Sequence, residues 1–83
     1  MEEEKLIGKI THYFSKIGVA VVELSDELKV GDTIKIVGPN TEFTQVVESM
    51  EIEHKKVDVA KAGDLVGLKV GQKVKEGYKV YKL

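Results

Sequence analysis

The chain has 83 residues, of which 42% are hydrophobic and 33% charged, the balance of a single soluble globular domain. It contains no cysteine, which excludes disulfides, thiol catalysis and zinc sites built on thiolates. All 13 positive charges are lysines and the net charge is −1, whereas proteins that read specific DNA sequences are usually basic and use arginine. No apolar run approaches the ~20 residues of a membrane span, and the acidic start, Met1-Glu2-Glu3-Glu4-Lys5, is unlike a signal peptide. We therefore expect a cytoplasmic protein that binds neither a membrane nor specific DNA.

The hydrophobic pattern predicts strands rather than helices, because short β-branched runs recur between glycine-containing turns. Residues 1–5 are expected to form a charged N-terminal tail and residues 6–83 one barrel domain. The predicted strands cover 6–13, 19–24, 33–37, 44–54, 65–70 and 79–82. Regular spacing with a turn at each break is typical of a sandwich or a small barrel. Closure removes exposed sheet edges, so we predict an all-β fold: a single closed six-stranded antiparallel β-barrel.

A short frame recurs at 28–34, 60–66, 68–74 and 74–80: an apolar residue, Lys, any residue, Gly, two further residues and an apolar residue. It predicts a tight turn that leads into a strand, with Gly at a positive φ and the apolar residues at the end of the barrel. Asp32 and Asp64 are expected to bond nearby backbone donors. Phosphate binding by these glycines is the alternative, although no P-loop pattern accompanies them.

Two stretches depart from strict alternation. Val47 can share a face with Met50 only if the strand bulges between them, near residues 48 and 49. In 17–24 both faces are apolar, and only one face of a barrel strand points inward. Val19 and Val21 form one of these faces, and the face that points outward must be covered by a loop, a terminus or a partner. Val19 and Val21 are therefore the candidate protein interface.

Groups suited to catalysis are sparse. His12 and His54 stand at predicted strand ends, and no His/Asp/Glu spacing is typical of a metal cage. No serine lies in a nucleophile-elbow frame, and the strand glutamates alternate with apolar residues as solvated positions do. We expect a non-enzymatic chain with no metal and no cofactor, and a small hydrolase is the weakest of the three functional hypotheses.

The C-terminal segment 69–82 carries five lysines and one glutamate, Glu76, with Tyr78 and Tyr81 between them. Such a segment can follow a nucleic-acid backbone while an aromatic ring stacks on a base. Lysine is equally common as an edge-protecting residue on late strands. The sequence leaves both interpretations open.

Several blocks of the sequence resemble known families. The run from Leu28 to Gly38, LKVGDTIKIVG, resembles the β-barrel second domain of translation GTPases such as elongation factor Tu, and so does Ile7-Gly8-Lys9-Ile10. Residues 47–54 resemble that domain's bent strand, and 60–68 resemble its A-x-A-G-D-x-V-G-L turn and strand. No P-loop domain accompanies these blocks, so the resemblance implies a stand-alone or excised barrel without GTP. Residues 11–24 are similar instead to the C-terminal barrel of the collagenase-like peptidase family, which is associated with RNA modification in bacteria.

The first resemblance implies RNA contact, because the barrel of aminoacyl-tRNA-carrying factors holds the 3′ end of the tRNA. Glu51 matches the family's glutamate in the bent strand, and His54 falls where the factor has a basic residue. Leu65 replaces a polar amide and Lys69 an apolar residue, and the family's early G-R-G run is missing. A plain structural interpretation of Glu51 is a strand residue paired with a neighbouring lysine.

The leading prediction is a non-enzymatic, elongation-factor-like module that contacts tRNA, ribosomal RNA or the associated machinery. The predicted RNA contacts are Tyr13, Lys16, Glu51, His54 and Lys69. Phosphate contacts would dominate, so affinity would fall with salt. The alternative is a protein–protein docking module, whose face at Val19 and Val21 binds a separate RNA-modifying or peptidase-like enzyme subunit.

Overall fold

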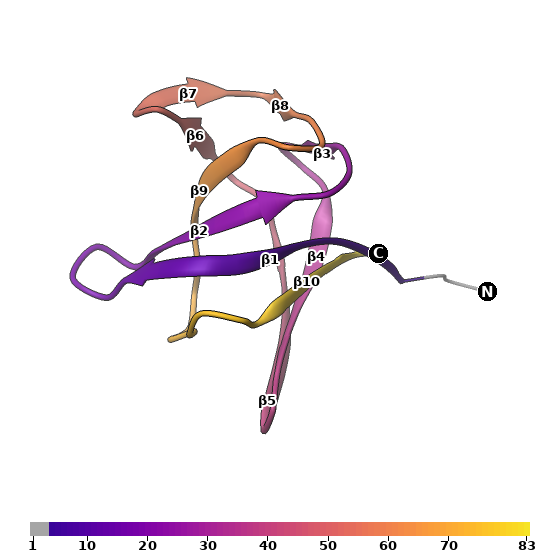
Figure 1. The fold of residues 1–83 in the computed structure, drawn as a ribbon, viewed down its shortest axis with the longest axis vertical. Helices are drawn as coiled ribbons and strands as arrows, with labels where there is room; N and C mark the ends of the chain where they lie inside the picture. The colour runs from indigo at the N-terminus through magenta and orange to yellow at the C-terminus, as the bar shows by residue number, and fades with distance from the viewer. Residues whose placement is uncertain (1–3) are drawn as a thin grey trace.

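The computed structural model describes residues 4–83, and this part of the chain is all-β, with no helix (Figure 1). Every strand pair is antiparallel, so the predicted fold class is confirmed at this level. The strands are β1 (Lys5–Phe14), β2 (Val19–Leu24), β3 (Leu28–Lys29), β4 (Thr33–Gly38), β5 (Thr41–Val46), β6 (Met50–Ile52), β7 (Lys55–Val57), β8 (Val59–Ala60), β9 (Leu65–Lys69) and β10 (Lys79–Lys82).

The strands form one eight-stranded sheet, in the order β5-β4-β10-β1-β2-β9-β6-β7, and a two-stranded sheet, β3-β8. The predicted number of six is therefore wrong. The long strand expected at 44–54 is interrupted at residues 47–49, and a separate hairpin, β6–β7, follows the interruption. The sheet curls around a common interior in Figure 1, but within residues 4–83 no ladder joins β5 to β7. Complete closure of the barrel thus stays a prediction.

The interruption at residues 47–49 lets Val47 and Met50 share one face of the sheet, as the bulge hypothesis required. Val47 and Met50 both point inward and are 2% and 1% exposed. A regular strand would have placed these two residues on opposite faces, because side chains alternate. The extra backbone at 48 and 49 therefore lets both side chains join the core.

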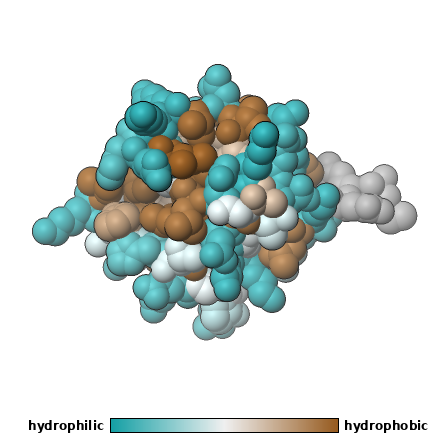
Figure 2. Space-filling model, turned by 45° about the horizontal axis from the view of Figure 1, so that its top comes forward, coloured by the Kyte–Doolittle hydropathy of each residue, from teal (hydrophilic) through white to brown (hydrophobic). Residues whose placement is uncertain are grey.

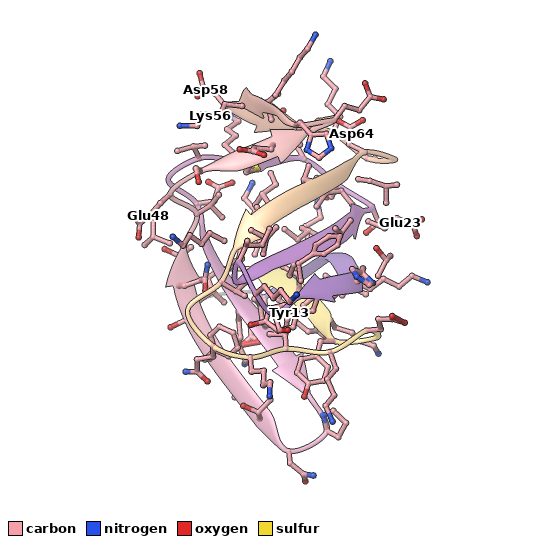
Figure 3. All side chains as sticks on the ribbon, turned by 90° about the vertical axis from the view of Figure 1, so that its left-hand side faces the viewer. Tyr13, Glu23, Glu48, Lys56, Asp58 and Asp64 are labelled. Atoms are coloured by element: carbon pink, nitrogen blue, oxygen red, sulfur yellow. The ribbon has the colours of Figure 1, made fainter. Side chains whose placement is uncertain are left out.

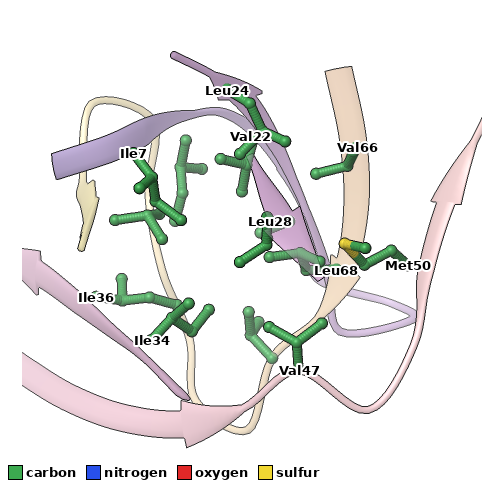
Figure 4. Close-up of a cluster of buried hydrophobic side chains, with 14 of the residues drawn as sticks. Ile7, Val22, Leu24, Leu28, Ile34, Ile36, Val47, Met50, Val66 and Leu68 are labelled. Carbon is green, nitrogen blue, oxygen red and sulfur yellow. The ribbon is translucent and has the colours of Figure 1, made fainter. Parts of the chain in front are cut away.

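The core is built from alternate residues of strands that are distant in sequence (Figure 4). On β2 and β4, every second side chain is buried and the residues between are not. Each fully buried aliphatic side chain contributes about 1.5–3 kcal/mol relative to an exposed one. No polar or charged residue among 4–83 is buried, so this interior is held by apolar contacts alone. The labelled core residues are Ile7, Val22, Leu24, Leu28, Ile34, Ile36, Val47, Met50, Val66 and Leu68.

The repeated frame builds the same turn three times. In each turn the glycine has a positive φ of 91–98° and donates its N–H to the carbonyl of a facing residue. The facing residue donates its own N–H to the carbonyl of the residue that follows the glycine. Each turn is therefore clamped by two hydrogen bonds of 2.7–2.9 Å. The glycines and their facing residues are Gly31 with Val47, Gly63 with Leu24, and Gly77 with Ile10.

The side chain after the glycine caps two of the three turns. Asp32 Oδ2 accepts the N–H of Lys29, and Asp64 Oδ2 accepts the N–H of Lys61, both at 2.9 Å, as predicted. In the third turn this position is Tyr78, whose ring packs directly against Gly38. A Cβ on Gly38 would stand only 2.5 Å from Cζ of that ring. The glycine N–H groups are used inside the clamps, which removes the basis for the phosphate interpretation.

The remaining occurrence of the frame, at 68–74, is not such a turn, because Gly71 has no positive φ. Instead, Gly71 donates its N–H to Gln45 Oε1 at 3.0 Å, and Gln45 Nε2 donates to the carbonyl of Lys69 at 2.8 Å. This side-chain amide takes the place of a peptide group between the end of β5 and the end of β9. It bridges the two segments where no backbone ladder joins them.

The start of β1 is fixed by ion pairs. Lys5 pairs with Asp26, and this contact holds the pKa of Asp26 below its usual range and raises the pKa of Lys5. Lys35 donates to both carboxylate oxygens of Glu4, at 2.7 and 2.9 Å, which raises the pKa of Lys35. Of the predicted tail, residues 1–3 lie outside the described residues, and Lys5 is already part of β1.

Candidate functional site

The outward side of four neighbouring strands, β1, β2, β9 and β6, forms the candidate site. The strand register sets two rows across it. One row runs Phe14, Val19, Lys69, and the other runs His12, Val21, Gly67, Glu51. Leu65 stands at the next outward position of β9, opposite Glu23. We call these eight residues the outer face: His12, Phe14, Val19, Val21, Glu51, Leu65, Gly67 and Lys69.

The middle of the outer face is apolar. Val19 and Val21 are half-buried, whereas Phe14 is 47% and Leu65 53% exposed. Ile17, in the turn beside Phe14, is 62% exposed. Figure 2 shows hydrophobic residues gathered on a surface rimmed by hydrophilic ones. Isolated exposed apolar residues are ordinary, but a contiguous group with a polar rim is typical of an interaction surface.

The opposite side of β2 behaves as the two-faced pattern predicted. Ala20, Val22 and Leu24 are at most 3% exposed and belong to the core. Val19 and Val21 therefore occupy the outward face, which within residues 4–83 is only partly covered.

The charged rim of this face carries both signs. Lys69 is exposed at one end, and Glu51 is exposed beside Gly67. Glu51 stands opposite Lys56 on β7, so it has the lysine neighbour that its interpretation as an ordinary strand residue requires. Even so, neither residue takes part in an ion pair within 4 Å among residues 4–83. Both charges are therefore unpaired within the described part of the chain.

The five residues predicted to contact RNA do not form one site. Glu51 and Lys69 join the outer face, one strand apart. Tyr13 pairs with buried Ala20 and packs against the core (Figure 3). Lys16 lies in the β1–β2 turn, and His54 lies in the β6–β7 turn with a φ of 66°, outside any strand.

Sequence reasoning missed Phe14 and Leu65 as members of the outer face. Phe14 is the outward partner of Val19 across the β1–β2 hairpin. Strict alternation from buried Ile10 would have turned Phe14 inward, and it points outward because the register of β1 shifts between Ile10 and His12. Its ring also makes an edge-on contact with His12, with the ring centroids 4.4 Å apart. Leu65 was considered only as a departure from a family pattern, although it faces Glu23 on β2.

A separate groove of about 400 Å³ lies at the junction of β5 and β9. Gln45 forms part of its wall, but both polar atoms of that amide are already hydrogen-bonded to the backbone. Among residues 4–83, no three His, Cys, Asp or Glu side chains are grouped so that they could hold a metal ion. That same stretch contains no helix of the length and apolarity that crossing a membrane requires.

Comparison with known proteins identifies relatives over almost the whole chain. A family model, the peptidase family U32 C-terminal domain, matches residues 2–78. A protein of Methanocaldococcus jannaschii, described as an uncharacterized protease, is 46% identical over 78 residues, which cover 93% of this chain and 19% of that protein. A collagenase of Porphyromonas gingivalis is 38% identical over 82 residues, which cover 96% and 23%. The chain thus spans about a fifth of the length of these curated relatives.

Solved structures agree with the sequence matches. A crystal structure of the C-terminal domain of a Geobacillus thermoleovorans protein assigned to the U32 peptidases has a TM-score of 0.89 and 26% identity, covering 95% of this chain and 92% of that one. A selenomethionine variant of the same domain has a TM-score of 0.87 and 25% identity, covering 92% and 96%. The resemblance to the second domain of translation GTPases receives no support from these matches. The resemblance to the barrel of collagenase-like proteins is confirmed, and this chain belongs to the family of peptidase U32 C-terminal domains.

Proposed function

We propose that this chain is a non-enzymatic docking domain of a U32 peptidase-like protein, and that its outer face binds the larger remaining part of such a protein. The observation that carries the proposal is the apolar centre formed by Phe14, Val19, Val21 and Leu65. The chain matches about a fifth of each curated relative, so in those proteins most of the polypeptide lies beside a domain of this kind.

The composition of the outer face suits a protein partner. Exposed Phe14 and Leu65 can enter pockets of a partner, and aromatic anchors dominate the energetics of many protein interfaces. Val19 and Val21 lie on a strand held on both sides, by β1 and by β9, so little conformational entropy is lost when they are covered. Glu51 and Lys69 at the rim would fix orientation more than affinity.

RNA contact explains the surface less well. The lysines are spread over the chain, the net charge is −1, and the predicted contact residues point in different directions. Binding to a nucleic-acid backbone depends on clustered cations, because released counterions supply most of its free energy. The docking hypothesis uses side chains that the fold does place together.

The direct test is binding in trans. The Methanocaldococcus jannaschii relative would be prepared without the segment that matches this chain, and its association with the 83-residue domain measured by titration calorimetry. A saturable one-to-one complex is expected. Val21→Asp should weaken it at least about ten-fold, because a charge would be placed in the apolar centre.

Val46→Asp is the matched control, since Val46 is also exposed, at 49%, but lies on β5, away from the outer face. It should bind as the unmodified domain does. Equal binding by a folded Val21→Asp variant, or no complex with the unmodified domain, would overturn the proposal. Saturable binding of bulk tRNA with a steep salt dependence would support RNA contact in its place.

A further inference from the structure

A second site lies at the bulge in β1, at the edge of the outer face, where Glu23 stands opposite Leu65. The register of β1 against β10 shifts between Leu6 and Gly8, which leaves one extra residue on β1. That residue, Ile7, is fully buried, and Leu6 and Lys9 on either side of the bulge are exposed. Bulges re-aim side chains in this way and are over-represented beside functional sites.

A mostly apolar pocket of about 180 Å³ opens at this bulge. Pockets that hold an entire small-molecule ligand usually measure about 300–1,000 Å³, so this one has room for a single side chain. Its lining includes Leu6, Gly8, Lys9, Glu23, Leu24 and Lys79. None of them belongs to the outer face.

The pocket is rigid because of how tightly β1 and β2 meet there. A Cβ on Gly8 would stand 2.7 Å from the carbonyl oxygen of Glu23 and 2.8 Å from Val22 Cγ1, which no real side chain tolerates. Leu24, another pocket residue, is 3% exposed and belongs to the core. A ligand would therefore meet a preformed surface and lose little free energy in ordering it.

Two lysines stand at the mouth of the pocket in an unfavourable arrangement. Lys9 and Lys79 are directly opposite each other on β1 and β10, and both are exposed. Like charges at such positions destabilise a sheet. Among residues 4–83 neither lysine forms an ion pair within 4 Å, and Glu23, opposite Lys9 on β2, forms none either. An anion placed between the two lysines would relieve their repulsion.

We propose that this pocket binds a polypeptide segment in which a large aliphatic side chain stands next to a carboxylate. The aliphatic side chain enters beside Leu6 and Leu24, and the carboxylate lies between Lys9 and Lys79. Glu23 lies on the far side of Lys9 from β10, so it repels a carboxylate bound anywhere else on the rim. The site thus selects both the charge and its position relative to the apolar group.

The test is a titration of the isotope-labelled domain, followed by amide chemical shifts, with blocked tetrapeptides. The probe is acetyl-Gly-Leu-Asp-Gly-amide, and its comparison peptides replace Asp with Asn or Leu with Ala. The Leu-Asp peptide should cause saturable shifts at Gly8, Lys9 and Leu24. Each comparison peptide should bind at least about ten-fold more weakly, because it lacks the ion contact or the apolar contact.

Lys79→Glu should abolish binding of the Leu-Asp peptide and leave the rest of the spectrum, and hence the fold, unchanged. Lys73→Glu is the matched control, because Lys73 is exposed in the β9–β10 connection, and it should leave binding intact. If the Leu-Asp peptide gives no saturable shifts at millimolar concentration, or if the Leu-Asn peptide binds equally well, the proposal is wrong. The titration uses this domain alone with a short peptide, so its failure and a failure of the docking test with the relative are distinguishable.

Discussion

The two sides of β2 are built from the same kinds of residue and have opposite roles. Ala20, Val22 and Leu24 are sealed by the other strands, whereas Val19 and Val21 are covered only in part by side chains of this chain. Hydrophobicity alone does not separate the two sets. What separates them is whether the fold supplies a covering layer, and one side of this curled sheet has none in residues 4–83. Residues on the inner side should therefore control stability, and those on the outer side should control association.

The largest difference should appear when one acidic residue is placed on each side of β2. Val22→Asp buries an unpaired carboxylate in an apolar core and should cost about 4 kcal/mol or more, leaving the domain largely unfolded. Val21→Asp should cost about 1 kcal/mol or less, because its carboxylate can reach water. Urea unfolding followed by circular dichroism measures both, and similar losses would show that Val21 belongs to the core.

A second comparison uses two copies of the repeated frame. Gly31→Ala forces a side chain into a φ of 98°, with no atom within 4 Å of the added Cβ, so its cost is conformational and about 1–2 kcal/mol. Gly71→Ala should cost less, because Gly71 has no positive φ and the added Cβ makes ordinary contacts. Chemical denaturation of the two variants gives the difference, and a reversed order would contradict the clamped-turn interpretation.

A gain in stability is expected on the outward side of β1 and β10. Lys79→Glu converts a like-charge pair with Lys9 into an opposite pair and should stabilise the domain by about 0.2–1 kcal/mol. Thermal unfolding at low salt would show the increase, which added salt should reduce. A loss of stability would mean that Lys79 has a structural contact that the cross-strand register does not reveal.

The smallest effect concerns pH. Because Lys5 holds the pKa of Asp26 below its value in the unfolded chain, the ionised Asp26 stabilises the fold above that unfolded value, and this contribution is lost as pH falls through the lowered one. The unmodified domain should therefore be slightly more stable than Asp26→Asn at neutral pH. The two midpoints should converge below about pH 4, and a constant offset would argue against the ion pair as the cause.

The sequence was most informative where a local rule decides the structure. The frame with Gly31 and Gly63 predicted positive φ angles and aspartate caps because both follow from the few residues involved. The same frame wrongly predicted a positive φ at Gly71, where the backbone is held by a hydrogen bond to Gln45 at the end of a distant strand. The outer face was found in part through Val19 and Val21, but its other members depend on which strands become neighbours. Pairing of that kind is long-range information that a single chain's pattern does not contain.

The three clamped turns also set an order for folding. The first clamp closes the short segment from 31 to 47, the second spans 24 to 63, and the third joins Ile10 to Gly77. Loops that join distant residues cost more entropy and form later, so the third clamp should form last. The pairing of β1 with β10 depends on the same late contact. During synthesis, β1 therefore keeps one free edge until β10 has left the ribosome, and in that interval the nascent domain is most exposed to aggregation.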